Sequence, residues 1–95
     1  MGADLKGKVA VITGASGGLG AHFARLLAQN GAAVAITARR VDKIQTLADE
    51  INASGGRAVA YGLDVADAHA IAPALDRAQS DLGGLDILVN NAGVG

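Results

Sequence analysis

Residues 9–20 read VAVITGASGGLG and decide the fold. Five apolar or β-branched residues, typical of a buried strand, run directly into a segment with glycines at Gly14, Gly17, Gly18 and Gly20. A helical apolar pattern then resumes. A solvent-exposed turn needs one or two glycines, so four of them indicate that another group comes very close to the backbone here.

The rest of the chain alternates short apolar strands with single helices. We expect strands at 9–13, 33–37, 58–63 and 87–90, and helices that begin near residue 19 and span 42–54 and 67–82. This alternation is typical of right-handed βαβ units around a parallel sheet. It predicts an α/β, doubly wound fold (β-α-β-α-β-α-β) with strand order 3-2-1-4 and the third helix opposite the first two.

Local patterns refine these helices. In the first helix the apolar residues Leu19, Phe23, Leu26 and Leu27 fall on one stripe, which we expect to be buried, and Asn30-Gly31 ends the helix with a left-handed cap. In the second helix Asp42 and Gln45 have the spacing of a capping box. Pro73 lies inside the third helical pattern and predicts either a kink or a later helix start.

Two distant segments then meet at one edge of the sheet. Residues 14–20 follow the first strand and Asn90-Asn91 follows the fourth, and ligands of open α/β sheets bind where such strands finish. A strand-to-helix loop presents free backbone N–H groups and the positive end of a helix dipole, which suit a phosphate. A flexible turn is the simpler alternative. A P-loop is excluded because no Gly-Lys-Ser/Thr follows at the required spacing.

Composition narrows the function classes further. Ninety-five residues, 51% of them hydrophobic, suit one small domain, and a net charge of -1 gives no electrostatic case for nucleic acid or an anionic membrane. Cysteine is absent, which excludes disulfides and thiolate metal sites, and His22 and His69 have no companion at ligand spacing. The start MGADLKGK resembles no signal peptide, and we expect a cytoplasmic protein.

The motifs resemble one family. Thr13-Gly14-x-x-x-Gly18-x-Gly20 followed by Asn90-Asn91-Ala92-Gly93 is similar to the classical short-chain dehydrogenase/reductase family, as are the lead-in LKGKVAVITGAS and the segments LDV at 63–65 and LDILV at 85–89. The resemblance implies a Rossmann-like fold that binds NAD or NADP, here as a single domain over residues 1–95.

The resemblance also implies roles for individual residues. Gly14, Ser16, Gly18, Leu19 and Gly20 match the loop that holds the pyrophosphate and ribose, and Thr13 matches a threonine whose hydroxyl braces that loop. Asp64 and Val65 match a pair that borders adenine, although Asp64 taken alone is more often a cap or turn residue. Asn90, Ala92 and Gly93 match residues on the ribose side, and Asn91 matches a brace within the sheet.

The cofactor preference depends on the end of the second strand. Proteins of this fold that prefer NAD place an acidic residue there to bond the ribose 2′-hydroxyl. This chain has Ala38 at that position, and Arg39 follows where NADP-binding relatives keep a basic residue. We therefore expect NADP(H) rather than NAD(H). NAD(H) stays the alternative, because position 17 is Gly where many NADP-binding relatives carry a second basic residue.

The family's catalytic groups have no counterpart in these residues. They are a serine, a tyrosine followed four residues later by lysine, and an asparagine, all beyond the fourth strand. Here the single tyrosine is Tyr61, and Val65 stands four places on. We expect the cofactor-binding half of an oxidoreductase that acts on alcohol or carbonyl groups, with no catalytic or metal-ligating residue in this chain and a homo-oligomer at full length. A non-catalytic dinucleotide-binding module is the alternative; a Tyr-x-x-x-Lys with an upstream Ser in the following hundred or so residues would decide.

Overall fold

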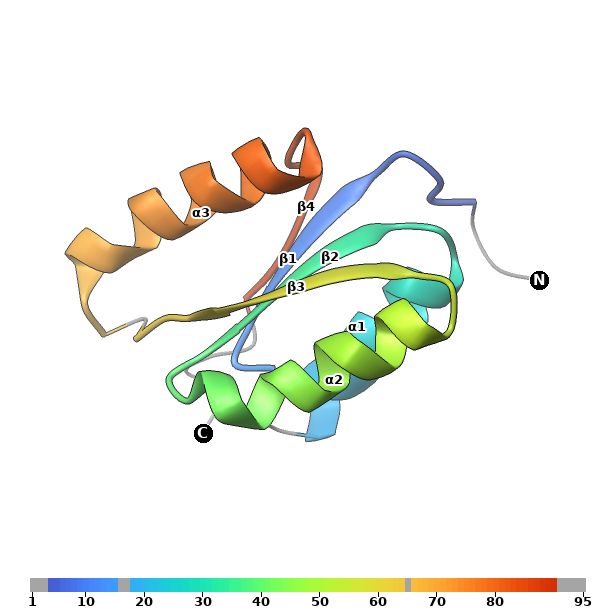
Figure 1. Ribbon diagram of the computed structural model, residues 1–95. Helices are drawn as coiled ribbons and strands as arrows, with labels where there is room; N and C mark the ends of the chain where they lie inside the picture. Colours follow the sequence, from blue (N-terminus) through green and yellow to red (C-terminus); the bar gives the residue numbers. More distant parts are fainter. Residues whose placement is uncertain (1–3, 16–17, 65, 91–95) are drawn as a thin grey trace.

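The computed structural model describes residues 4–15, 18–64 and 66–90. Four strands and three helices alternate along them (Figure 1). They are β1 (Val9–Thr13), α1 (Gly18–Gln29), β2 (Ala33–Ala38), α2 (Val41–Ala53), β3 (Arg57–Gly62), α3 (Ala68–Leu82) and β4 (Ile87–Asn90). The strands form one parallel sheet in the order β3-β2-β1-β4, so the predicted Rossmann-like topology is confirmed.

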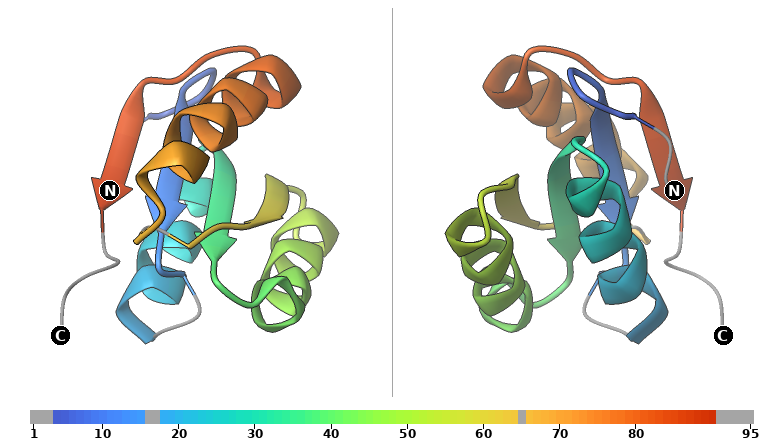
Figure 2. Two further views of the ribbon diagram at one scale, coloured as in Figure 1. Left: turned by 90° about the vertical axis from the view of Figure 1, so that its left-hand side faces the viewer. Right: turned by 90° about the vertical axis from the view of Figure 1, so that its right-hand side faces the viewer.

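The helices cover the sheet on both faces, with α1 and α2 on one side and α3 on the other (Figure 2). Because successive strand residues point to opposite faces, β1 contributes to two cores. Ala10 and Ile12 belong to the core beneath α1 and α2, whereas Val9 and Val11 belong to the core beneath α3. The predicted placement of the third helix opposite the first two is therefore correct.

Two hydrogen bonds between Val9 and Asp86 fix where β4 lies relative to β1. The Val9 N–H donates to the Asp86 carboxylate (2.9 Å), and the Asp86 N–H donates to the Val9 carbonyl (2.9 Å). From this start the two strands stay in register, which sets Thr13 opposite Asn90. The alignment at one end of the sheet thus determines which residues meet at the other end.

Gly31 shows why the chain turns where it does after α1. Its φ is +101°, a left-handed conformation that glycine adopts without steric cost, as the Asn30-Gly31 pair predicted. A Cβ at this position would also lie 2.9 Å from the Lys6 backbone nitrogen. Glycine is required here for both reasons, and the turn delivers the chain into β2.

The predicted buried stripe of α1 is confirmed only in part: Leu27 packs against the core and Phe23 is half-buried, but the other two residues are exposed. Leu19 and Leu26 are 55% and 45% exposed, and the buried positions of the helix are Gly20 and Ala24. Residues without large side chains let the helix backbone approach the sheet closely. The helix is consequently rotated about its axis, and part of its large apolar surface faces outward.

The starts of α2 and α3 also differ from expectation. The predicted Asp42–Gln45 capping box is absent: the N-cap of α2 is Arg40, without a side-chain cap, and Gln45 donates to Asp49. Asp42 already lies in the first helical turn, where its charge interacts with the helix dipole. The later start suggested by Pro73 is wrong as well, because α3 begins at Ala68 and continues through the proline.

Asp67 explains the early start of α3. Its side chain accepts a hydrogen bond from the His69 N–H (3.0 Å), which satisfies one of the free donors of the first turn. Pro73 lies in the second turn of this helix. The cap therefore decides where the helix begins.

Candidate dinucleotide site

The candidate site lies at the carboxyl edge of the sheet, which we define as the end where the parallel strands finish. Thr13 ends β1, Ala38 ends β2 and Asn90 ends β4, so the structure brings these chain-distant residues to one edge. The helix α1 begins at the same edge with Gly18. Five residues to which the sequence assigned roles lie outside the described residues, as does Gly17: Ser16, Val65, Asn91, Ala92 and Gly93.

The turn after β1 has a conformation that depends on glycine. Gly14 has a φ of +67°, in the left-handed region where a side chain is strained. The next residue, Ala15, is buried, and its N–H donates to the Thr37 carbonyl at the end of β2 (2.9 Å). The loop that leaves β1 is therefore tied to the neighbouring strand as soon as it has turned.

Gly18 differs from Gly14, because its backbone does not require glycine. Its φ is not in the left-handed region, and an added Cβ would meet no described atom within 4 Å. Neither strain nor packing in the described structure thus explains the missing side chain. Among the described residues, the absence of a Cβ leaves space above the first turn of α1.

The start of α1 is electrostatically suited to an anion. The first N–H groups of a helix have no partner within the helix, and the dipole adds partial positive charge. The first turn, which the structure describes completely, contains no Asp or Glu to offset this charge. Leu19, exposed at this position, and Gly20, buried against the sheet, contribute backbone N–H groups to the same turn.

Thr13 and Asn90 are joined by a hydrogen bond across the edge. Thr13 is buried, and its Oγ1 donates to Asn90 Oδ1 (3.0 Å), with the Val89 carbonyl 3.5 Å away. This bond links the loop after β1 to the last residue of β4. The two segments are thereby held at a fixed separation before any ligand binds.

Arg39 stands on the exposed surface directly after β2. It takes part in none of the ion pairs found among the described residues, whereas its neighbour Arg40 pairs with Asp42 (3.2 Å). Ala38, the position that would be acidic in an NAD-preferring site, is 3% exposed. The guanidinium at this corner is thus available to an incoming anion.

Asp64 has a local structural role. Its Oδ1 accepts a hydrogen bond from the Ala66 N–H (3.0 Å), and its carbonyl accepts from the Asp67 N–H (3.0 Å). These bonds form a turn between β3 and α3, which is the simpler interpretation of this residue. The exposed carboxylate still lies at the carboxyl edge, one residue after Leu63, whose N–H donates to the Ala38 carbonyl (2.8 Å).

Sequence reasoning missed Thr37. It is the last-but-one residue of β2, its side chain is 1% exposed, and its Oγ1 donates to the Ile12 carbonyl (3.2 Å). In the sequence it is one more β-branched residue in an apolar strand. A hydroxyl in an otherwise apolar strand is the signal that could have identified it.

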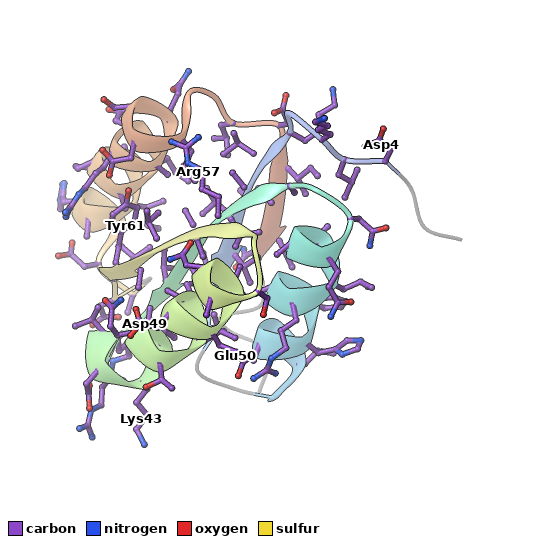
Figure 3. All side chains as sticks on the ribbon, turned by 45° about the vertical axis from the view of Figure 1, so that its right-hand side comes forward. Asp4, Lys43, Asp49, Glu50, Arg57 and Tyr61 are labelled. Carbon is purple, nitrogen blue, oxygen red and sulfur yellow. The ribbon has the colours of Figure 1, made fainter. Side chains whose placement is uncertain are left out.

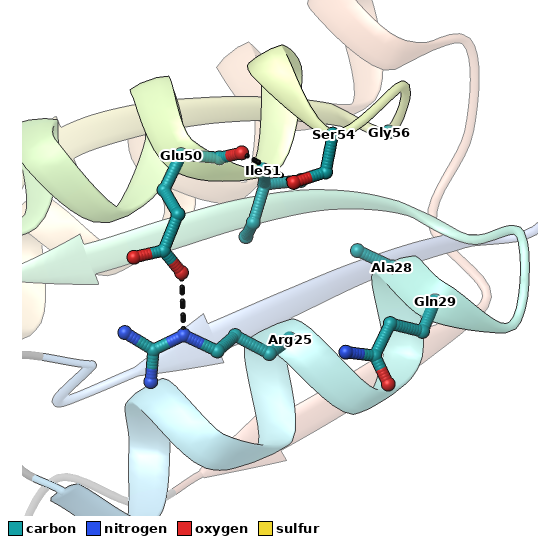
Figure 4. A pocket seen from close by; sticks show the side chains of 7 residues that line it. All are labelled: Arg25, Ala28, Gln29, Glu50, Ile51, Ser54 and Gly56. Atoms are coloured by element: carbon teal, nitrogen blue, oxygen red, sulfur yellow. Dashed lines mark hydrogen bonds and ion pairs between the residues drawn. The ribbon is translucent and has the colours of Figure 1, made fainter.

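Two hollows lie away from this edge. One of about 100 Å³ lies between α1 and α2, where Arg25 and Glu50 form an ion pair (2.6 Å) across it (Figure 4). The pairing raises the pKa of Arg25 and lowers that of Glu50, chiefly through their side-chain hydrogen bond. The second, of about 270 Å³, lies at the opposite end of the sheet beside Lys8 and Arg57. Neither hollow includes a residue assigned to the candidate site.

Tyr61 and Arg57 hold α3 on the strand β3. Figure 3 shows both side chains on the side of β3 toward α3. The Tyr61 hydroxyl donates to the Asp81 carboxylate, and Arg57 donates to the Asp81 carbonyl (2.9 Å), where it also offsets the negative end of the helix. Burial raises the pKa of Tyr61 to about 12, with a smaller contribution from Asp81. These residues stabilise the fold and lie outside the candidate site.

The described part of the chain contains neither a helix suited to span a membrane nor a cluster of metal ligands. None of its helices combines the length and hydropathy needed to cross a membrane. Within the same residues, no group of three His, Cys, Asp or Glu side chains is arranged to hold a metal ion.

Several known proteins are similar to this chain in sequence and in fold. An uncharacterised oxidoreductase of Mycobacterium tuberculosis is 45% identical over 92 residues, which cover 94% of this chain and 27% of that protein. A metagenomic short-chain oxidoreductase solved in complex with NADP is 46% identical with a TM-score of 0.90, over 98% of this chain and 42% of that one. A dehydrogenase/reductase from Sinorhizobium meliloti is 49% identical with a TM-score of 0.91, over 96% and 36% of the two chains.

The chain is thus much shorter than the relatives it matches, while the match covers nearly all of it. The pattern of the family described as short chain dehydrogenase matches residues 8–95. This range includes every element of the sheet and the whole carboxyl edge. The chain belongs to the short chain dehydrogenase family.

Proposed function

We propose that this chain is the dinucleotide-binding part of an oxidoreductase that transfers hydride between a nicotinamide cofactor and an alcohol or carbonyl carbon. The observation that carries the proposal is the open start of α1. Among the described residues, Gly18 leaves room above a helix terminus that has no acidic residue, and Gly14 has the left-handed conformation that the turn after β1 requires. A pyrophosphate matches both the space and the charge.

Different residues of the chain would bind different parts of the cofactor. The loop formed by Gly14, Ser16, Gly18, Leu19 and Gly20 would hold the pyrophosphate through backbone N–H groups, braced by Thr13. The exposed carboxylate of Asp64 would accept a hydrogen bond from the adenine amino group. Val65 would donate its backbone N–H to a nitrogen of the adenine ring. Asn90, Ala92 and Gly93 would line the ribose. When bound, the nicotinamide supplies or accepts the hydride.

We further propose that NADP(H) is preferred over NAD(H). The support is the exposed Arg39, which has no ion-pair partner among the described residues, beside a buried Ala38 where NAD-preferring proteins carry a carboxylate. The guanidinium can make a charge-assisted hydrogen bond to the adenosine 2′-phosphate. The relative solved with NADP is consistent with this preference.

Gly18→Asp in the full-length protein that carries this sequence tests the proposal. The new carboxylate would lie in the first turn of α1, where it stabilises the helix by about 0.3–1 kcal/mol. It would also occupy the pyrophosphate position and repel its charge, and such repulsion costs several kcal/mol. We therefore expect unchanged or slightly higher thermal stability, together with a loss of NADPH affinity of more than about a hundredfold.

Gly84→Asp is the matched control. Gly84 precedes β4 at the opposite end of the sheet, and a Cβ there would make an ordinary contact, 4.0 Å from Val9 Cγ2. This variant adds the same charge away from the site, so NADPH affinity should stay within about twofold of wild type. Equal binding by Gly18→Asp and wild type would reject a pyrophosphate site at this helix.

A further inference from the structure

We propose that Thr37 is a positioning residue that aligns the glycine loop with Arg39. The inference rests on the proposed function, since it concerns how two groups that bind one cofactor are held at a fixed separation. Thr37 and Thr13 are the two buried threonines among the described residues, and both lie at the carboxyl edge. A buried hydroxyl is costly unless it is hydrogen-bonded, so its partner indicates what it does.

Two hydrogen bonds from Thr37 to the chain around Gly14 lie on either side of the turn after β1. Its Oγ1 donates to the carbonyl of Ile12, just before the turn, at 3.2 Å. Its own carbonyl accepts from the N–H of Ala15, just after the turn, at 2.9 Å. Thr37 therefore holds both ends of the Thr13-Gly14 segment, whose direction is set by the left-handed conformation of Gly14.

The same residue lies two positions before Arg39. The strand that carries the predicted 2′-phosphate contact is thus attached to the loop that carries the predicted pyrophosphate contact. Both groups belong to one ligand, so their separation must match it. Binding groups must be held to within about 0.5 Å, by residues whose own positions are fixed by packing and hydrogen bonds. At 1% exposure, Thr37 satisfies this condition.

Thr37→Val and Thr37→Ser distinguish the contribution of the hydroxyl from that of the methyl group. Valine has nearly the same shape but cannot donate to Ile12, whereas serine keeps the donor and loses a methyl group. The net free-energy contribution of one hydrogen bond corresponds to about a two- to tenfold change in an equilibrium constant. We expect Thr37→Val to weaken NADPH binding by this factor and NADH binding less, because NADH makes no 2′-phosphate contact with Arg39.

Thr37→Ser should bind NADPH within about twofold of wild type, even though the lost methyl group lowers its unfolding temperature. Affinities are measured by calorimetry on the full-length protein, at a temperature where circular dichroism shows each variant folded. A second measurement needs no ligand: amide hydrogen exchange at Ala15 should be faster in Thr37→Val than in Thr37→Ser. If Thr37→Val does not fold, Thr37→Ala replaces it: Thr37→Ala should lose the NADPH affinity that Thr37→Ser retains, and equal affinities of these two variants would overturn the inference.

The inference is overturned if Thr37→Val binds NADPH as tightly as wild type, or if Thr37→Ser loses as much affinity as Thr37→Val. The first result would leave the hydroxyl without a role in binding, and the second would assign Thr37 to packing alone. Failure of the proposed function gives a different result, because wild type itself would then bind neither NADPH nor NADH.

Discussion

Replacement of Arg39 by alanine should reduce the preference of the full-length protein for NADPH over NADH. A hydrogen bond to a charged group contributes about 1.5–3 kcal/mol. Arg39 lies on the exposed surface, where water competes for the guanidinium, so we expect the lower end of this range. At about 1.4 kcal/mol per tenfold change, Arg39→Ala should weaken NADPH binding about tenfold. NADH affinity should change little, because it has no phosphate at this position.

Arg40→Ala provides a control with the same change in charge. Arg40 is adjacent but pairs with Asp42 (3.2 Å), so its removal should alter NADPH affinity less than about twofold. The assay is a titration of each variant with NADPH and with NADH at one fixed ionic strength. An equal loss for both cofactors in Arg39→Ala would make this residue a general electrostatic contributor. Tighter binding of NADH than NADPH by wild type would refute the NADP preference.

Three further results are expected. Ala38→Asp should lower the unfolding temperature of the free protein, because it places a carboxylate at a position that is 3% exposed. It should also strengthen NADH binding relative to NADPH binding. Unchanged selectivity in paired titrations would show that Ala38 is not the position that selects the cofactor. Tyr61 is the single tyrosine of residues 1–95, and its pKa of about 12 lies above the ordinary 10, so its neutral form is favoured by folding. Its contribution to stability should be complete below about pH 10 and lost as the pH rises toward 12. The measurement is the difference in tyrosinate absorbance between the full-length protein and its Tyr61→Phe variant, and a midpoint near 10 in this difference would contradict the expectation. A polypeptide of residues 1–95 alone should self-associate through the edge strand β4, where Leu88 is 54% exposed; a monodisperse monomer with a cooperative melt in gel filtration and calorimetry would be the opposite result.

Strand order and the location of the candidate site could be predicted because they depend on patterns that are local in sequence. Apolar runs separated by helical periodicity imply βαβ units, and the handedness of these units leaves few topologies. The carboxyl edge, with Gly14 and Asn90 on it, follows from that topology alone.

The remaining features depend on tertiary contacts that no local pattern specifies. Periodicity alone placed Leu19 and Leu26 in the core, but close approach of Gly20 and Ala24 to the sheet rotates α1 away from that arrangement. The role of Thr37 was missed for a related reason: its partners, Ile12 on β1 and Ala15 just after it, lie more than twenty residues away in the sequence. A threonine in a strand otherwise resembles any β-branched residue.

The most direct test of a dinucleotide site at the carboxyl edge is a map of backbone amide chemical shifts during titration of the full-length protein with NADPH. The largest shift changes are expected at Gly14, Gly18, Arg39 and Asn90, which the fold brings to that edge. The amide of Arg57, at the opposite end of the sheet, should not respond. Saturable changes confined to the opposite end of the sheet, or to the hollow between α1 and α2, would contradict the proposed site.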